Sequence, residues 1–269
     1  MKENVEAPAH GDRLNVFLLN QSESMAVHVE EFGTSMADAV ASSVNLYLQK
    51  LDQLRKLMPI GFTGDHFAVV VVGYGPEAAK VLLRIDPTRT EADEERTRSD
   101  KSGISSDSEQ MNFPVWVKPV ANGRATLCHA LASAHDLISP WVKRHQGANP
   151  PNVINITDGS VSDGDPREVA ERIMELSTLN GNATIWHCCL ASSKSEPVFF
   201  PTEEVYSTFP DAWKLFVESS SVLPQEAIPD LLLQFPEVSK VAGARCCIFN
   251  ADLAMLVRAI AAITHLPLP

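Results

Sequence analysis

The stretch VFLLNQSES, residues 16 to 24, joins an apolar run to a polar loop and decides the fold. Four consecutive apolar residues, Val16 to Leu19, are typical of a short strand that is buried on both faces of a sheet. The polar residues that follow, Asn20 to Ser24, would then lie at the carboxyl end of that strand, which is where ligands gather in an open α/β sheet. The stretch therefore predicts a central strand followed by a binding loop.

Strands and helices alternate along the chain after this loop. Ser35 and Asp38 fit a capping box at the start of an amphipathic helix, which we expect to run to about Met58. A short strand at 81–85 should pair antiparallel with the strand before it, because only a tight turn at Gly75-Pro76 separates the two. The longer buried strands are expected at 66–73, 152–158 and 183–190. The alternation predicts an α/β fold with a doubly wound, mostly parallel central sheet and helices on both faces.

Three further helices carry start and stop signals. One begins near Thr126 and is expected to stop at Ser139-Pro140 and restart as a second short helix. Another opens at Asp165-Pro166, with Asp165 as its N-cap, and is expected to close at Asn180-Gly181. The last helix is capped by Asp252.

Two stretches lack such a pattern. Residues 86–113 are charged and rich in Ser and Thr, with few large apolar groups, so we expect a mobile acidic and polar insertion. Residues 195–251 are interrupted by six prolines, so we expect an irregular C-terminal elaboration. Neither stretch marks a boundary between domains, and the sequence predicts a single domain over residues 1–269.

The charge balance and the cysteines argue against several classes of protein. The net charge is −12 and the Lys and Arg residues are thinly spread, so we expect no positive surface for nucleic acid or an anionic membrane. The N-terminus lacks the apolar region of a signal peptide and no apolar run is long enough to span a membrane, so we expect a cytoplasmic protein. The five cysteines form no C-x-x-C pair, which predicts buried free thiols in place of a disulfide framework or a zinc ribbon.

Polar side chains follow the predicted strands at three points where loops should meet. The loops are residues 20–24, 123–126 and 158–159. Ser22, Ser24 and Thr126 supply hydroxyl oxygens. Asp158 adds a carboxylate, which completes an all-oxygen set suited to Mg²⁺ or Mn²⁺ with a position left open for an outside ligand.

These residues resemble the metal-ion-dependent adhesion site of the von Willebrand factor A (VWA) domain family, whose pattern is D-x-S-x-S, then a Thr, then an Asp. The resemblance covers nearly the whole chain and looks closest to the bacterial stand-alone VWA proteins. Further similar segments are VGYG at 72–75, VINITDG at 153–159, LFVESS at 215–220 and FNAD at 249–252. The resemblance implies a VWA/Rossmann-like fold in which the three hydroxyls hold the cation directly and Asp158 acts through water. It also implies a cytoplasmic protein, often encoded near a protein kinase and a metal-dependent protein phosphatase, with a role in stress or conflict responses.

Asn20 departs from the family pattern, because a carboxylate is usual at that position. An amide oxygen can still accept a hydrogen bond from a serine hydroxyl or a bound water, but one negative charge beside a divalent cation is lost. We therefore expect a weakened site, which holds Mg²⁺ only at high concentration or with a partner carboxylate present. The expected metal residues are Asn20, Ser22, Ser24, Thr126 and Asp158. Glu23 and Arg124-Ala125 stand where glycines are common in the family; Glu23 could supply the missing charge, although a solvent-facing side chain is the favoured interpretation.

Two enzymatic alternatives are weaker. Gly73-Tyr74-Gly75 begins a G-x-G-x-x-A pattern after a strand, as in a dinucleotide-binding oxidoreductase, but the segment that follows reads as a strand and not as the crossover helix that such a turn needs. A hydrolase would combine Ser22 or Ser24 with His129 and with the Asp158 carboxylate. It lacks the G-x-S-x-G elbow of many hydrolases, and His129 fits an ordinary helix position.

The sequence thus favours a non-catalytic protein-interaction module. Its binding face would be formed by the loops around Asn20, Thr126 and Asp158, where an Asp or Glu of a protein partner would complete the coordination of the cation. A kinase, a phosphatase or an ATPase encoded nearby is the expected class of partner. Asp163 is expected to be a turn residue and His187 a core residue.

Overall fold

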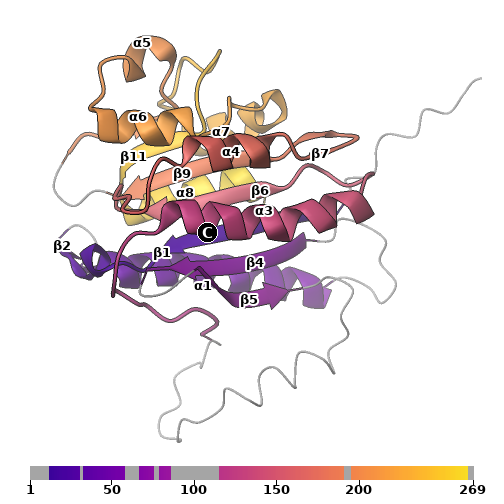
Figure 1. Cartoon of the computed structure of the whole chain (residues 1–269), viewed down its shortest axis with the longest axis horizontal. Coiled ribbons are helices and arrows are strands. Elements are labelled where there is room, and N and C mark those ends of the chain that lie inside the picture. Colours follow the sequence, from indigo (N-terminus) through magenta and orange to yellow (C-terminus); the bar gives the residue numbers. More distant parts are fainter. Residues whose placement is uncertain are drawn as a thin grey trace, which may run out of the picture.

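The computed structural model describes residues 12–30, 33–57, 67–75, 79–85, 115–190 and 195–265. Its main strands are β1 (Arg13–Asn20), β4 (Phe67–Tyr74), β5 (Lys80–Ile85), β6 (Asn152–Thr157), β9 (Thr184–Leu190), β10 (Val198–Phe199) and β11 (Cys247–Ala251). They form one seven-stranded sheet in the order β10-β11-β9-β6-β1-β4-β5 (Figure 1). The pairs between β11, β9, β6, β1 and β4 are parallel, whereas β5 and β10 pair antiparallel at the two edges. The predicted α/β fold with a mostly parallel, VWA/Rossmann-like sheet is confirmed.

Helices cover both faces of this sheet because successive strand residues point to opposite sides. Phe17 and Leu19 of β1 pack with α1 (Met36–Leu57) and α8 (Leu253–Thr264). Val16 and Leu18 pack on the other side with α3 (Leu127–Arg144), α4 (Arg167–Met174) and α6 (Asp211–Glu218). Figure 1 shows α3 and α4 in front of the sheet and α1 and α8 fainter behind it.

The predicted starts of the first and last helices are confirmed. The Asp38 backbone N–H donates to Ser35 Oγ over 3.1 Å, which is one half of the capping box of α1. The Met255 backbone N–H donates to Asp252 Oδ1 over 2.7 Å at the start of α8. Both helices are therefore fixed at their N-termini by the residues that the sequence indicates.

Two predicted helix ends are wrong. α3 runs through Pro140 without a break, since a proline removes only one helical hydrogen bond and the apolar face continues with Trp141 and Val142. α4 ends at Met174, six residues before Asn180-Gly181. Asn180 instead lies in the turn of a small hairpin, β7 (Ser177–Thr178) and β8 (Gly181–Asn182), and Gly181 begins β8 with a φ of +140°.

The stretch 195–251 is more regular than its prolines indicate. It contains β10, β11, α5 (Glu203–Tyr206), α6, the short 3₁₀ helix η2 (Gln225–Ala227) and α7 (Ile228–Gln234). Prolines stand just before or at the first positions of these helices, as Pro210 does before α6 and Pro229 does in α7, because a proline at a helix start costs no hydrogen bond. β11 lies between β9 and β10, so this stretch completes the sheet.

The remaining small elements are η1 (Glu23–Ala26) and the hairpin of β2 (His28–Val29) and β3 (Thr34–Ser35). The predicted insertion at 86–113 lies outside the described residues. All five cysteines are free; four of them are buried, as predicted, and Cys128 is half-buried. Among the helices of the described ranges, none is both long enough and apolar enough to cross a membrane.

Candidate functional site

The structure brings the three predicted loops together at the carboxyl ends of the parallel strands. The Asn122 backbone N–H donates to Gln21 O over 2.7 Å and the Glu23 N–H donates to Gly123 O over 3.0 Å, which joins the first loop to the second. The Ser162 N–H donates to Ala125 O over 2.8 Å and joins the second loop to the third. Residues 20–24, 122–126 and 158–163 therefore form one connected surface, called the loop face below.

Asn20 is the centre of this loop face. It is only 2% exposed, and its side-chain Nδ2 donates to Asp158 Oδ1 over 2.9 Å and to Thr157 Oγ1 over 3.1 Å. Its Oδ1 accepts from the Ser22 backbone N–H over 2.9 Å. The amide thus fastens the loop after β1 to the loop after β6. Its oxygen accepts from the Ser22 N–H within its own loop, so in this arrangement the side chain of Asn20 links the two loops.

The two serines of the first loop lie beside Asn20. The hydroxyl oxygens of Ser22 and Ser24 are 2.9 Å apart, so one donates to the other. Ser22 is buried and Ser24 is exposed at the start of η1. The Glu23 side chain is exposed as well, in agreement with the solvent-facing interpretation.

The side-chain hydroxyl of Thr126 is the polar group of the loop face whose surroundings point most directly to a ligand. It directly precedes α3, and its Oγ1 is buried with no hydrogen-bond partner in the described part of the chain. A buried polar atom without a partner costs about 1–3 kcal/mol. A hydroxyl left in this state is suited to a small ligand that reaches it, such as a metal ion or a water molecule.

Asp158 uses one carboxylate oxygen to hold its own loop. Oδ1 accepts from the Ser160 backbone N–H over 3.1 Å, from Ser160 Oγ over 2.6 Å and from Asn20 Nδ2. The role of Ser160 was missed from the sequence, although Asp-Gly-Ser is a typical signal for such a side-chain turn. Oδ2 makes no hydrogen bond to any residue that the structure describes, and it is the oxygen left for a cation or a water.

Asp163 lies in a bend of the third loop, as expected of a turn residue, and its carboxylate also caps α3. Its carboxylate accepts from the backbone N–H groups of Cys128 and His129 over 3.1 and 3.0 Å. Its Oδ2 also lies 2.9 Å from His129 Nδ1. Burial by itself would raise the pKa of Asp163, but the hydrogen bonds from His129 and Cys128 hold that pKa below its usual value. His129 therefore pairs with Asp163 in this structure, and no hydrogen bond joins it to the described serines of the first loop.

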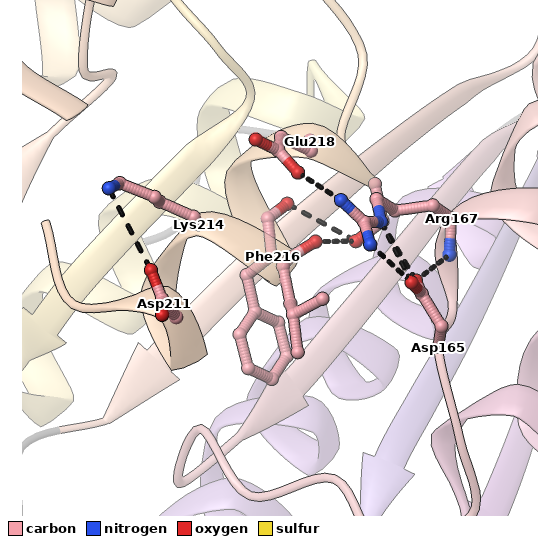
Figure 2. A network of polar contacts seen from close by, with 8 residues as sticks. Asp165, Arg167, Asp211, Lys214, Phe216 and Glu218 are labelled. Atoms are coloured by element: carbon pink, nitrogen blue, oxygen red, sulfur yellow. Dashed lines mark hydrogen bonds and ion pairs between the residues drawn. The ribbon is translucent and has the colours of Figure 1, made fainter. Parts of the chain in front are cut away.

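Asp165 lies just before α4 and ties the third loop to a second helix. The N-cap position is held by Pro166, so the predicted N-cap at Asp165 is one residue too early. Its Oδ1 accepts from the Arg167 backbone N–H over 3.0 Å. The Arg167 side chain lies between Asp165 and Glu218 of α6, with Nη1 2.7 Å from Glu218 Oε2 (Figure 2). Figure 2 also shows Lys214 beside Asp211 in α6, with 3.8 Å between the charged atoms. The Arg167 side chain therefore links the end of the third loop to α6.

Gly73-Tyr74-Gly75 serves the close packing of the loop face. A Cβ at Gly75 would lie 2.6 Å from the backbone C and O of Gln21 and 2.9 Å from Asn122 O. A Cβ at Gly73 would lie 2.1 Å from Gln21 Oε1. The glycines are needed because the first loop passes directly over this strand end, and the antiparallel β5 follows where a dinucleotide turn would need a helix. The oxidoreductase alternative is not favoured.

A chain of buried hydrogen bonds runs from the loop face into the sheet. Tyr74 Oη donates to Asn155 Oδ1 over 2.8 Å, and Asn155 Nδ2 lies 3.0 Å from His187 Nδ1. His187 Nε2 lies 3.1 Å from Ser219 Oγ. Burial lowers the pKa of His187 to about 4, so the ring is neutral near pH 7 and the core interpretation of this residue is confirmed.

The connected loops and the mostly parallel sheet define a VWA-like α/β fold.

No protein-family model matches the chain. No curated protein matches its sequence. The described residues contain no group of three or more His, Cys, Asp or Glu side chains that could hold a metal ion.

Solved structures offer distant likenesses. The SpRpn10 VWA domain has a TM-score of 0.41 and 12% identity, with 78% of this chain and 82% of that chain covered. An aerotolerance-related membrane protein from Bacteroides fragilis has a TM-score of 0.37 and 13% identity, with 65% and 66% covered. The pilus adhesin SpaC from Lactobacillus rhamnosus GG has a TM-score of 0.42 and 11% identity, with 66% of this chain but only 25% of the adhesin covered. Likeness at this level assigns no activity, ligand or partner to this chain.

Proposed function

We propose that this protein is a non-catalytic interaction module of VWA type, which binds a protein partner on the loop face and carries a weak cation site there. The observation that carries the proposal is the buried Thr126 Oγ1, which has no hydrogen-bond partner among the described residues and lies in a loop joined to both the Ser22-Ser24 loop and the Asp158 loop. An oxygen that is costly to bury alone is stabilised when a ligand binds it.

The donor set fits a hard cation only in part. Hydroxyls from Ser22, Ser24 and Thr126 and the free oxygen of Asp158 are all oxygen donors, which suit Mg²⁺ or Mn²⁺. Asp158 is the one carboxylate among the five proposed residues, and its Oδ1 is already occupied by hydrogen bonds. A cation would hold a partner's Asp or Glu at its open position, while low charge in the site keeps its affinity low.

The fold around Asn20 gives a sharp test of the cation site. In Asn20→Asp, an oxygen would replace the Nδ2 that now lies 2.9 Å from Asp158 Oδ1, and two carboxylates at that distance repel each other. A divalent cation relieves the repulsion. We therefore expect titration calorimetry to show tighter Mg²⁺ or Mn²⁺ binding by Asn20→Asp than by the parent, and we expect Mg²⁺ to raise the melting temperature of the variant more than that of the parent.

Thr126→Ala in the Asn20→Asp background should abolish the gain, since the buried hydroxyl is removed. Ser207→Ala is the matched control, because Ser207 is an exposed serine at the C-terminal end of α5 and its hydroxyl donates to Glu204 O, outside the loop face. If Asn20→Asp binds Mg²⁺ no better than the parent, the loops are not arranged as a cation site. If the parent itself binds tightly, Glu23→Gln tests whether Glu23 supplies the charge.

Binding to a partner is tested directly by affinity capture from the native cell. The proposed partner is a protein of a bacterial stress, signalling or defence complex, such as a kinase, a phosphatase or an ATPase encoded nearby. Capture by the parent should be lost in Ser24→Ala combined with Thr126→Ala and retained in Ser207→Ala. Capture that survives the double substitution would place the partner on a different surface.

A further inference from the structure

An arginine lies at the edge of the loop face, and no carboxylate of the described residues forms an ion pair with it. Arg124 is exposed, and its Nη2 donates to Ser162 O over 2.9 Å. Its own backbone N–H donates to Gly75 O over 3.2 Å. In the described ranges no carboxylate pairs with Arg124, although the chain carries a net charge of −12.

The geometry holds this guanidinium in place and leaves most of it available. A guanidinium has five N–H donors, and the bond to Ser162 O uses one of them. The bonded carbonyl belongs to the Asp158 loop, and Arg124 is two residues before Thr126. The charge is therefore fixed between the second and the third loop, so less side-chain entropy is lost when a ligand binds it.

The loop face carries one negative charge fewer than the D-x-S-x-S pattern would give it, and its remaining carboxylates are Glu23, Asp158 and Asp163. Asn20 is neutral, and the Asp158 oxygen that faces it is occupied by Asn20 Nδ2 and by the Ser160 N–H and hydroxyl. Both features weaken the attraction for a cation, and both also weaken the repulsion of an incoming carboxylate. The hydroxyl of Ser24 is exposed and adds a polar group on the first loop.

We infer that Arg124 binds an Asp or Glu side chain of the partner directly, through a bidentate contact between the guanidinium and the carboxylate. The loop face would then recognise an acidic residue without a bound cation. The inference rests on one part of the proposed function, the binding of a protein partner to the loop face, and it gives Arg124 the contact with the partner's carboxylate that the proposed function gives to a cation. Asn20 and Arg124 act in the same direction, since one removes the negative charge that attracts a cation and the other supplies a positive charge built into the chain.

The test is an NMR titration of the ¹⁵N-labelled full chain with an acetylated and amidated Gly-Asp-Gly peptide in the presence of EDTA. The blocked ends leave the Asp side chain as the sole carboxylate, and the matching Gly-Asn-Gly peptide controls for contacts of the backbone. We expect Gly-Asp-Gly, and not Gly-Asn-Gly, to shift the amide signals of residues 22–24, 124–126 and 160–163. We expect Arg124→Gln to weaken this binding about fivefold, as for an exposed ion pair.

Arg144→Gln is the matched control, because Arg144 is also exposed and also bonds a single backbone carbonyl, that of Pro140, at the other end of α3. Its affinity for the peptide should equal that of the parent. Unchanged amide signals elsewhere in Arg124→Gln show that the variant is folded, and Arg124→Lys should recover part of the affinity through its charge.

The outcomes separate this inference from the proposed function. Peptide shifts that need Mg²⁺, or that are equal in the parent and in Arg124→Gln, overturn the role of Arg124 and leave the cation-dependent module standing. Shifts that occur in EDTA and depend on Arg124 support the inference even where Asn20→Asp fails to gain Mg²⁺ affinity. If the peptide shifts no loop-face signals, either with or without Mg²⁺, the inference is overturned. The affinity capture alone then tests whether the protein is an interaction module.

Discussion

The buried histidine of β9 makes stability depend on pH in a direction that can be worked out. His187 is fully buried, its Nδ1 accepts from Asn155 Nδ2, and its ring lies edge-on to Phe216 at 5.2 Å between ring centroids. Burial lowers the pKa of His187 to about 4 in the folded protein, against about 6.5 in an unfolded chain. Between these two values the unfolded chain binds a proton that the folded protein does not bind.

The free energy of unfolding must therefore fall as the pH falls. The contribution of His187 is fully present above about pH 6.5, is lost progressively below it, and levels off near pH 4. Each pH unit inside this window costs about 1.4 kcal/mol, so we expect a loss of about 3 kcal/mol at its lower end. Neighbouring carboxylates also titrate in acid, so the effect of His187 is the difference between the parent and a variant at this position.

Urea unfolding of the parent and of His187→Gln measures this difference. Glutamine can accept from Asn155 and donate to Ser219, so the variant keeps both contacts but cannot take up a proton. On going from about pH 7.5 to about pH 5.5, we expect the parent to lose about 1.4 kcal/mol more than the variant. His28→Gln, at an exposed position of β2, should keep the pH slope of the parent. Equal slopes for the parent and His187→Gln would refute the reasoning.

Two further substitutions test the packing of the loop face. Gly75→Ala should cost about 1–3 kcal/mol, because the new Cβ meets backbone atoms of Gln21 that cannot move aside; Gly147→Ala, where nothing lies within 4 Å, is the control, and equal melting temperatures would contradict the prediction. Asp163→Ala should cost about 1 kcal/mol and speed the hydrogen exchange of the first amides of α3, because it removes their cap; Asp136→Ala, at an exposed position in the middle of the same helix, should leave that exchange unchanged.

The sequence predicted the parts of the fold that depend on local pattern. Continuous apolar runs such as Val69 to Val72 can be stable only where both faces are covered, and these residues are buried in β4. The caps at Ser35 and Asp252 use partners three residues away, so their signal is complete within one turn of helix. Such features need no knowledge of the rest of the chain.

The errors occurred where one short sequence pattern fits two local structures, or where a residue's hydrogen-bond partner is far away in the sequence. Asn180-Gly181 can end a helix or turn a hairpin, and the choice depends on contacts of Asn180 with the backbone of Gly147 and Ala148, more than 30 residues away. The cap that Asp163 provides for α3 was missed because the two amides that it accepts from precede it by 34 and 35 residues. A local pattern contains no information about such contacts.

Asn20 combines both cases. The spacing of Ser22 and Ser24 after a buried strand correctly places Asn20 in a loop that meets the Thr126 and Asp158 loops. Its chemical role depends on Thr157 and Asp158, which lie 137 and 138 residues further along the chain. An aspartate there would place a second carboxylate beside that of Asp158, and two carboxylates at that distance repel each other. The amide instead donates to the Thr157 hydroxyl and to the Asp158 carboxylate, and these hydrogen bonds contribute about 1 kcal/mol or more each and need no ion. The substitution that weakens the predicted metal site is therefore also the one that lets the loop face form without a metal.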